Sequence, residues 1–185
     1  MTYADDPVRL EIYFDHYNIY KHIREGELML DYIEMVNRLA EGRHITEKFV
    51  FDSRVRYGFD PLRKTHDWMR NNGFIVFLRY CDPNKQVQKG VDMTMGLEIQ
   101  RRAYENRFDV ALMITGDGDF APVCEYIRRL GKKVEVAAFD EILSSDLKSV
   151  VDRYHDLKNI ASPRFIEPDK DKITLTESEL AGECY

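Results

Sequence analysis

The sequence predicts an α/β fold, a three-layer sandwich in which helices cover both faces of a central, mostly parallel sheet of about five to six strands. Two observations carry this prediction. Short apolar segments alternate with segments whose apolar residues recur at helical spacing, which is typical of βαβ units. One such segment, residues 110–114, is apolar throughout and is followed by Gly116, as expected of a parallel strand that is buried on both faces.

The first half of the chain supplies three strands and two helices to this scheme. The short apolar segments at residues 11–15, 48–51 and 74–80 predict strands. Residues 28–40 and 62–70 carry apolar side chains at helical spacing and predict helices, the second of which ends at the Asn-Gly pair before the third strand.

The second half continues the alternation. Residues 91–106 predict a long helix, because apolar side chains recur there every four residues. A fourth strand at 110–114 leads into a helix at 120–130, which has proline in its first turn and glycine just past its end. A fifth strand at 133–139 and a helix at 143–151 follow. This βαβ alternation predicts a parallel sheet whose strands are joined by right-handed crossovers.

Composition limits the domain organisation and the compartment. With 185 residues, 44% of them hydrophobic, the chain suits one globular domain, expected at 1–160, followed by an acidic tail at 161–185. No signal segment is apparent and no apolar stretch approaches the ~20 residues that cross a bilayer, so secretion and membrane association are disfavoured. Three cysteines without Cys-x-x-Cys spacing indicate free thiols and a cytoplasmic protein.

Four carboxylates occupy positions that this fold brings together. Asp117 and Asp119 directly follow the strand at 110–114, Asp15 ends the first strand, and Asp92 lies at the start of the long helix. Ligands of open α/β sheets bind beyond the carboxyl ends of the strands, so we expect all four side chains to share one crevice. Mutually repelling carboxylates of this kind favour Mg²⁺ or Mn²⁺.

Other interpretations of these residues stay open at the level of sequence. The chain has 33 acidic residues, most of which must be solvated, and Asp119 could simply cap a helix. The five histidines show no pairing at zinc-ligand spacing, and the glycines after the fourth strand match neither a P-loop nor a dinucleotide-binding fingerprint. The net charge of −6 counts against a broad basic face for nucleic acid.

Three ordered segments resemble the NYN branch of the PIN-like nucleases, the LabA-like group. They are Asp15-x-x-Asn18, Lys89-Gly90-Val91-Asp92, and residues 115–120 followed by 131–134. The similarity spans roughly residues 12–160 and adds a closing helix and a short final strand within 147–157. It implies a PIN-like fold and a metal-dependent ribonuclease.

The resemblance also implies roles for individual residues. It points to Asp15, Asp92, Asp117 and Asp119 as ligands of Mg²⁺ or Mn²⁺, with Asn18 completing the catalytic set. Members of the family often have glycine after the first aspartate, where this chain has His16, which could contact substrate. The resemblance makes Thr115 a supporting polar group. Independently of it, the stretch after the second strand mixes cations with an aromatic ring that could contact bases, or it is an ordinary surface loop: Arg54, Arg56 and Tyr57. Lys89 is close enough in sequence to Asp92 to contact a phosphate.

The predicted function is therefore hydrolysis of RNA phosphodiester bonds at a metal site, with single-stranded or structured RNA as the partner and a homodimer left open. The alternative is a non-catalytic RNA-binding or protein-interaction module on the same fold, which the His16-Tyr17 pair and the acidic composition favour. A phosphatase of the haloacid dehalogenase type requires a second aspartate two residues after Asp15, and Tyr17 stands there instead.

Overall fold

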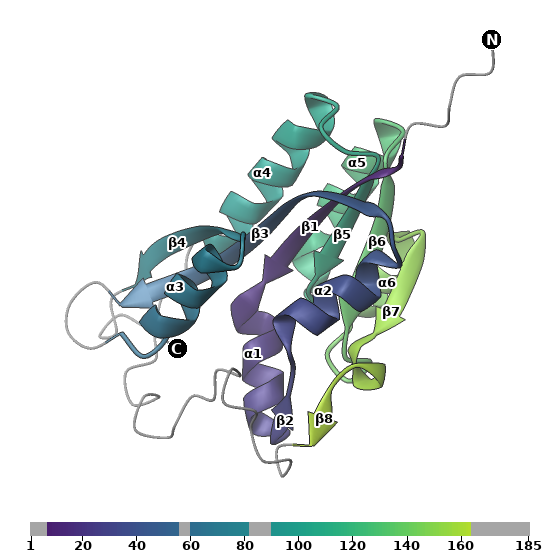
Figure 1. Cartoon of the computed structure of the whole chain (residues 1–185). Helices are drawn as coiled ribbons and strands as arrows, with labels where there is room; N and C mark the ends of the chain where they lie inside the picture. Colours follow the sequence, from purple (N-terminus) through teal and green to yellow (C-terminus); the bar gives the residue numbers. More distant parts are fainter. Residues whose placement is uncertain (1–6, 56–59, 82–89, 164–185) are drawn as a thin grey trace.

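A six-stranded, entirely parallel sheet forms the centre of the protein, which confirms the predicted α/β class. The computed structural model describes residues 7–55, 60–81 and 90–163. The strand order is β4-β3-β1-β5-β6-β7 (Figure 1). The strands are β1 (Arg9–Asp15), β3 (His44–Val55), β4 (Ile75–Cys81), β5 (Val110–Ile114), β6 (Lys133–Ala138) and β7 (Arg153–Asp156).

Helices cover both faces of this sheet, giving the three predicted layers (Figure 1). One face packs against α1 (His16–Glu25), α2 (Tyr32–Ala40) and α3 (Arg63–Asn71). The other face packs against α4 (Val91–Tyr104), α5 (Ala121–Arg129) and α6 (Ser145–Val150). Two short 3₁₀ helices, η1 (Gly118–Phe120) and η2 (Leu157–Asn159), follow β5 and β7.

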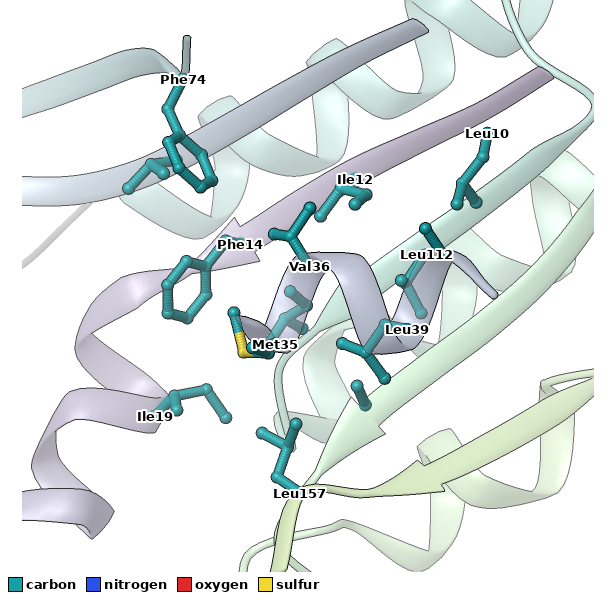
Figure 2. Packing of buried hydrophobic residues seen from close by; sticks show 14 of the residues in the cluster. Leu10, Ile12, Phe14, Ile19, Met35, Val36, Leu39, Phe74, Leu112 and Leu157 are labelled. Atoms are coloured by element: carbon teal, nitrogen blue, oxygen red, sulfur yellow. The ribbon is translucent and has the colours of Figure 1, made fainter. Parts of the chain in front are cut away.

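Alternating side chains of β1 pack into the two halves of the core, one on each face of the sheet. Leu10, Ile12 and Phe14 pack against α1 and α2, and Figure 2 shows Met35 and Leu39 of α2 lying over them. Tyr13 belongs to the opposite half, with the buried side chains of α4 and α5. Because β1 is central and buried on both faces, the position of its carboxyl end is fixed by packing on either side.

Helix α1 is the largest element that the sequence prediction missed. Asp15 acts as its N-cap, accepting a hydrogen bond from the backbone N–H of Asn18 at 3.4 Å. His16, Ile19, Tyr20 and Ile23 are its buried side chains, and their spacing is helical.

The helix predicted at 28–40 begins four residues later than expected. Asp31 caps α2 by accepting hydrogen bonds from the N–H groups of Ile33 and Glu34. Residues before this cap form β2 (Leu28–Met29), which pairs antiparallel with β8 (Ser162–Pro163). The first residues of the predicted tail at 161–185 thus join a small second sheet, and residues 164–185 lie outside the described part of the chain.

Strand β3 has 12 residues, far more than the segment predicted at 48–51. Its extensions contain polar residues with low strand propensity, and pairing with β1 on one side and β4 on the other extends the strand regardless.

Within the described residues, no helix combines the length and apolar character needed to span a membrane.

Candidate functional site

Parallel pairing of the two central strands brings the first two predicted segments together. In the register between β1 and β5, Phe14 lies opposite Ile114. Asp15 and Thr115 follow these two residues directly, so both chains leave the sheet at the same edge. This arrangement confirms that β1 and β5 are neighbours and that their carboxyl ends meet.

A cavity of about 410 Å³ opens at this edge of the sheet. Four of the predicted catalytic residues line it: Asp15, Asn18, Asp92 and Asp117. They come from the end of β1, the first turn of α1, the first turn of α4 and the loop after β5. The other lining residues are Tyr17, Lys21, His22, Glu25, Ser53, Val91 and Ile142.

Asp15 is the most deeply placed carboxylate of the cavity, with 5% of its surface exposed. The Thr115 hydroxyl donates a hydrogen bond to its Oδ2 at 3.0 Å. Burial, opposed by the hydrogen bond from Thr115 and aided by the negative charge of Asp92, raises the pKa of Asp15 to about 7. The side-chain oxygen of Asn18 accepts a hydrogen bond from the N–H of Gly116 at 2.9 Å, tying α1 to the loop after β5.

The remaining carboxylates lie closer to solvent. Burial raises the pKa of Asp92, and the charges of Asp117 and Asp119 add to this effect. Asp117 caps η1 by accepting a hydrogen bond from the N–H of Asp119 at 2.9 Å. Asp119 itself is exposed and does not line the cavity, although its effect on Asp92 shows that it lies nearby.

Two glycines allow the loop after β5 to lie against the loop before α6. A Cβ on Gly116 would lie 2.3 Å from the backbone oxygen of Ile142, and a Cβ on Gly118 would lie 2.5 Å from the hydroxyl oxygen of Ser144. The N–H of Ser144 donates to the carbonyl oxygen of Gly116 at 2.9 Å. This close backbone contact holds Asp117 in place between two ordered segments.

A second group of potential ligands, which the sequence did not reveal, lies beside the cavity. His16, Asp52 and His66 are all buried, and within the described chain they are the group of three whose ligand atoms lie within 4.8 Å of one another. Among the described residues, no three carboxylates of the cavity form such a group. Asp52 lies in β3 and His66 in α3, so only the folded chain brings the two histidines together.

Hydrogen bonds account for this buried group. Nδ1 of His16 and Nε2 of His66 lie 2.5 Å and 2.8 Å from the same oxygen of Asp52. Two ligands of one tetrahedral zinc ion would lie about 3.3 Å apart, so these distances describe hydrogen bonds. Burial opposes the charge on Asp52, but the neighbouring His16 and His66 outweigh it and hold the pKa of that carboxyl below its usual value.

The predicted substrate contacts are dispersed. His16 has no exposed surface and is hydrogen-bonded to Asp52 and to the Tyr32 hydroxyl, so it does not reach the cavity. Thr115 is buried and acts on Asp15, whereas Nε of Arg54 pairs with Asp60 at 3.1 Å. The other three predicted contacts lie outside the described residues: Arg56, Tyr57 and Lys89.

Sequence reasoning missed two basic side chains of the cavity, Lys21 and His22, because it did not predict α1. They lie one turn beyond Asn18. The His22 ring packs on Phe139, with 4.6 Å between ring centroids, which holds it beside the loop that follows β6. The cavity thus has aspartates at the end of the sheet, and Lys21, His22 and Glu25 along α1.

Comparison with known proteins identifies the family and the fold. The chain is 24% identical over 173 residues to Low amplitude and bright protein LabA from Synechococcus elongatus, covering 87% of this chain and 89% of that protein. The crystal structure of a protein of unknown function, VPA0982 from Vibrio parahaemolyticus, is similar with a TM-score of 0.72 and 22% identity, over 84% of this chain and 96% of that one. This second similarity shows the fold alone. The sequence profile of the NYN domain matches residues 9–158, and the chain therefore belongs to the NYN domain family.

Proposed function

We propose that this protein is a metal-dependent ribonuclease that hydrolyses RNA phosphodiester bonds in the cavity at the end of β1 and β5. One observation carries the proposal: three carboxylates from separate elements, Asp15, Asp92 and Asp117, line one cavity in an NYN domain. Carboxylates in such a position hold divalent cations in many enzymes that act on phosphate esters.

The donor set of the cavity fits Mg²⁺ or Mn²⁺. Its potential ligands are the carboxylate oxygens of Asp15, Asp92, Asp117 and Glu25, and oxygens are the ligands that these hard cations prefer. Burial and mutual repulsion raise the pKa values of Asp15 and Asp92, as expected where negative charge lacks a counter-charge.

In the proposed mechanism Asp15 and Asp117 are the central ligands, and Asp92 and Asp119 complete the site directly or through water. A divalent cation held by these residues would activate a water molecule for attack and would neutralise charge on the phosphate. Asn18 keeps its side-chain oxygen on Gly116 and so orients the loop that carries Asp117.

Two basic residues supply the phosphate contacts in this proposal. Lys21 and His22 line the same cavity as the carboxylates, one helical turn beyond Asn18. A lysine that approaches a phosphodiester adds charge-assisted hydrogen bonds without the need for a broad basic surface. This local arrangement reconciles RNA as substrate with the net charge of −6.

Three cysteines without paired spacing support a cytoplasmic location.

A panel of substrates tests the proposal. Purified protein is incubated with single-stranded RNA, duplex RNA, single-stranded DNA and p-nitrophenyl phosphate, each with EDTA, Mg²⁺ or Mn²⁺. We expect cleavage of RNA with Mg²⁺ or Mn²⁺, none with EDTA, and little turnover of the phosphate monoester. Lys21→Ala should raise KM for RNA more than it lowers kcat, because the ammonium group binds phosphate in both ground and transition states.

A matched control separates the site from the rest of the surface. Asp67→Asn changes an exposed aspartate of α3 that does not line the cavity, and it should leave RNA cleavage unchanged. Binding of RNA without cleavage in either metal would support the non-catalytic module instead. Turnover restricted to the phosphate monoester would indicate a phosphatase.

A further inference from the structure

A second, smaller cavity of about 310 Å³ adjoins the proposed metal site. It lies where the carboxyl ends of β3 and β4 meet the first turn of α4. Its lining is mostly apolar, through Phe51, Phe77, Leu78 and Val91, with polar groups from Asp52, Arg79 and Thr94. The volume is at the lower end of the range of ligand pockets, about 300–1,000 Å³, and suits a single ring system.

The two cavities are neighbours that share a lining residue. Val91 lines both of them, and its neighbour Asp92 belongs to the metal site. On the opposite side, the consecutive residues Asp52 and Ser53 of β3 line the second and the first cavity respectively. A nucleotide whose phosphate lies beside Asp92 therefore has its base within reach of the apolar cavity.

We propose that the second cavity binds one base of the RNA strand, adjacent to the phosphate that is cleaved. This inference rests on the proposed function and names a recognition subsite of the same site. Phe77 is partly exposed and stacks on Phe51, with 5.0 Å between ring centroids and an interplanar angle of 6°. Aromatic side chains on a sheet are common platforms for unpaired bases, because every base has a flat apolar face.

A cationic donor is held at the edge of this aromatic pair. The Nε–H of Arg79 donates to the Thr94 hydroxyl at 2.8 Å, and that hydroxyl donates in turn to the carbonyl oxygen of Gly90 at 2.6 Å. These bonds orient the guanidinium, whose Nη groups can donate to acceptor atoms on the edge of a base. Phe77 thus provides affinity for any base, and Arg79 provides a preference among bases.

Binding to RNA with single abasic positions tests this subsite. The probes are an eight-nucleotide single-stranded RNA and a set in which one base at a time is removed, with Ca²⁺ in place of Mn²⁺ and fluorescence anisotropy as the readout. For the wild-type chain we expect one position at which removal of the base weakens binding by about 5- to 100-fold. Phe77→Leu should weaken binding of the intact RNA by a similar factor and leave binding of the RNA lacking that base unchanged.

Two further variants make the result specific. Tyr104→Leu removes an exposed aromatic ring from the opposite end of α4 and should change neither affinity. Arg79→Gln changes an exposed side chain, so it tests the subsite even if Phe77→Leu fails to fold. It should reduce the difference in affinity among RNAs that carry each of the four bases at the sensitive position.

Distinct outcomes overturn the subsite and the proposed function. The subsite is overturned if no position of the RNA is sensitive to removal of its base. It is also overturned if Phe77→Leu weakens binding of intact and abasic RNAs equally, or if the base preference survives Arg79→Gln. If the wild-type chain still cleaves RNA with Mn²⁺, the ribonuclease assignment stands without it. A sensitive position without cleavage in Mn²⁺ supports the subsite and overturns the nuclease, and failure to bind RNA overturns both.

Discussion

Replacement of Asp15 by asparagine should stabilise the protein when divalent metal is absent. Asp15 is buried at the end of β1, where burial and the charge of Asp92 raise its pKa from 3.8 to about 7. The folded protein then binds a proton more tightly than the unfolded chain does, so the ionised carboxylate costs stability as pH rises from about 4 to 7. Asparagine has nearly the same shape and never ionises.

The magnitude follows from the shift. A rise from 3.8 to about 7 corresponds to about 4 kcal/mol of unfavourable free energy at pH 8, and to about 2 kcal/mol at pH 5. The carboxylate accepts hydrogen bonds from the Thr115 hydroxyl and the Asn18 N–H, and asparagine has only one oxygen for both, which costs about 1 kcal/mol. The net gain is therefore about 3 kcal/mol at pH 8 and about 1 kcal/mol at pH 5.

Urea unfolding in EDTA, at both pH values, measures this difference. The exposed Asp67→Asn variant is the control and should change the free energy of unfolding by less than about 0.5 kcal/mol. Added Mn²⁺ should stabilise the wild-type chain more than the Asp15→Asn variant, because the variant lacks a charged ligand. An Asp15→Asn variant that is less stable than wild type at pH 8, or a gain that does not shrink at pH 5, would refute the reasoning.

Three further predictions concern other parts of the site and the core. Gly116→Ala should destabilise the protein by about 2 kcal/mol or more in thermal melts, because its Cβ would lie 2.3 Å from a backbone oxygen. The control is Gly96→Ala, whose Cβ would meet only a side-chain methyl at 3.2 Å and which should change stability by no more than about 1 kcal/mol. Burial opposes the charge on Glu135, but its histidine and arginine partners outweigh burial and lower the pKa of this carboxyl to about 2. The ionised Glu135 therefore stabilises the fold above pH 4.5, and this stabilisation is lost as pH falls towards 2. Glu135→Gln should therefore lower the free energy of urea unfolding at pH 7 and have less effect at pH 3. In RNA cleavage with Mn²⁺, Asp117→Asn should lose more activity than Asp119→Asn, because only the first of these carboxylates lines the cavity.

The sequence predicted the parts of the fold that local pattern determines. The apolar run at 110–114 became β5, and its register with β1 placed Asp15 and Asp117 at one edge as expected. The sequence prediction lacks helix α1 because it does not assign Asp15 as an N-cap, and in the structure Asp15 accepts the capping hydrogen bond. An aspartate in the sequence looks the same whether it caps a helix, binds a metal or does both, so its type alone does not reveal the helix.

Other features depend on contacts between distant segments. His16 and His66 are 50 positions apart, and only the packing of α1 and α3 on β3 brings both to Asp52. Strand β3 extends through polar residues because its first half pairs with β1 and its second half pairs with β4. The apolar cavity beside Phe77 likewise combines two strands and a helix, so no single segment of the sequence indicates it.

The central claim is that the carboxylates at the end of β1 and β5 bind a divalent cation that is required for cleavage of RNA. The most direct measurement is the rate of cleavage of an end-labelled single-stranded RNA as Mn²⁺ is titrated into metal-free protein, for the wild-type chain and for Asp117→Asn. The account predicts a rate that rises with Mn²⁺ and saturates for wild type, and that is lowered by at least about a hundredfold in the variant. Equal cleavage by the two proteins, or wild-type cleavage that persists in EDTA, would contradict it.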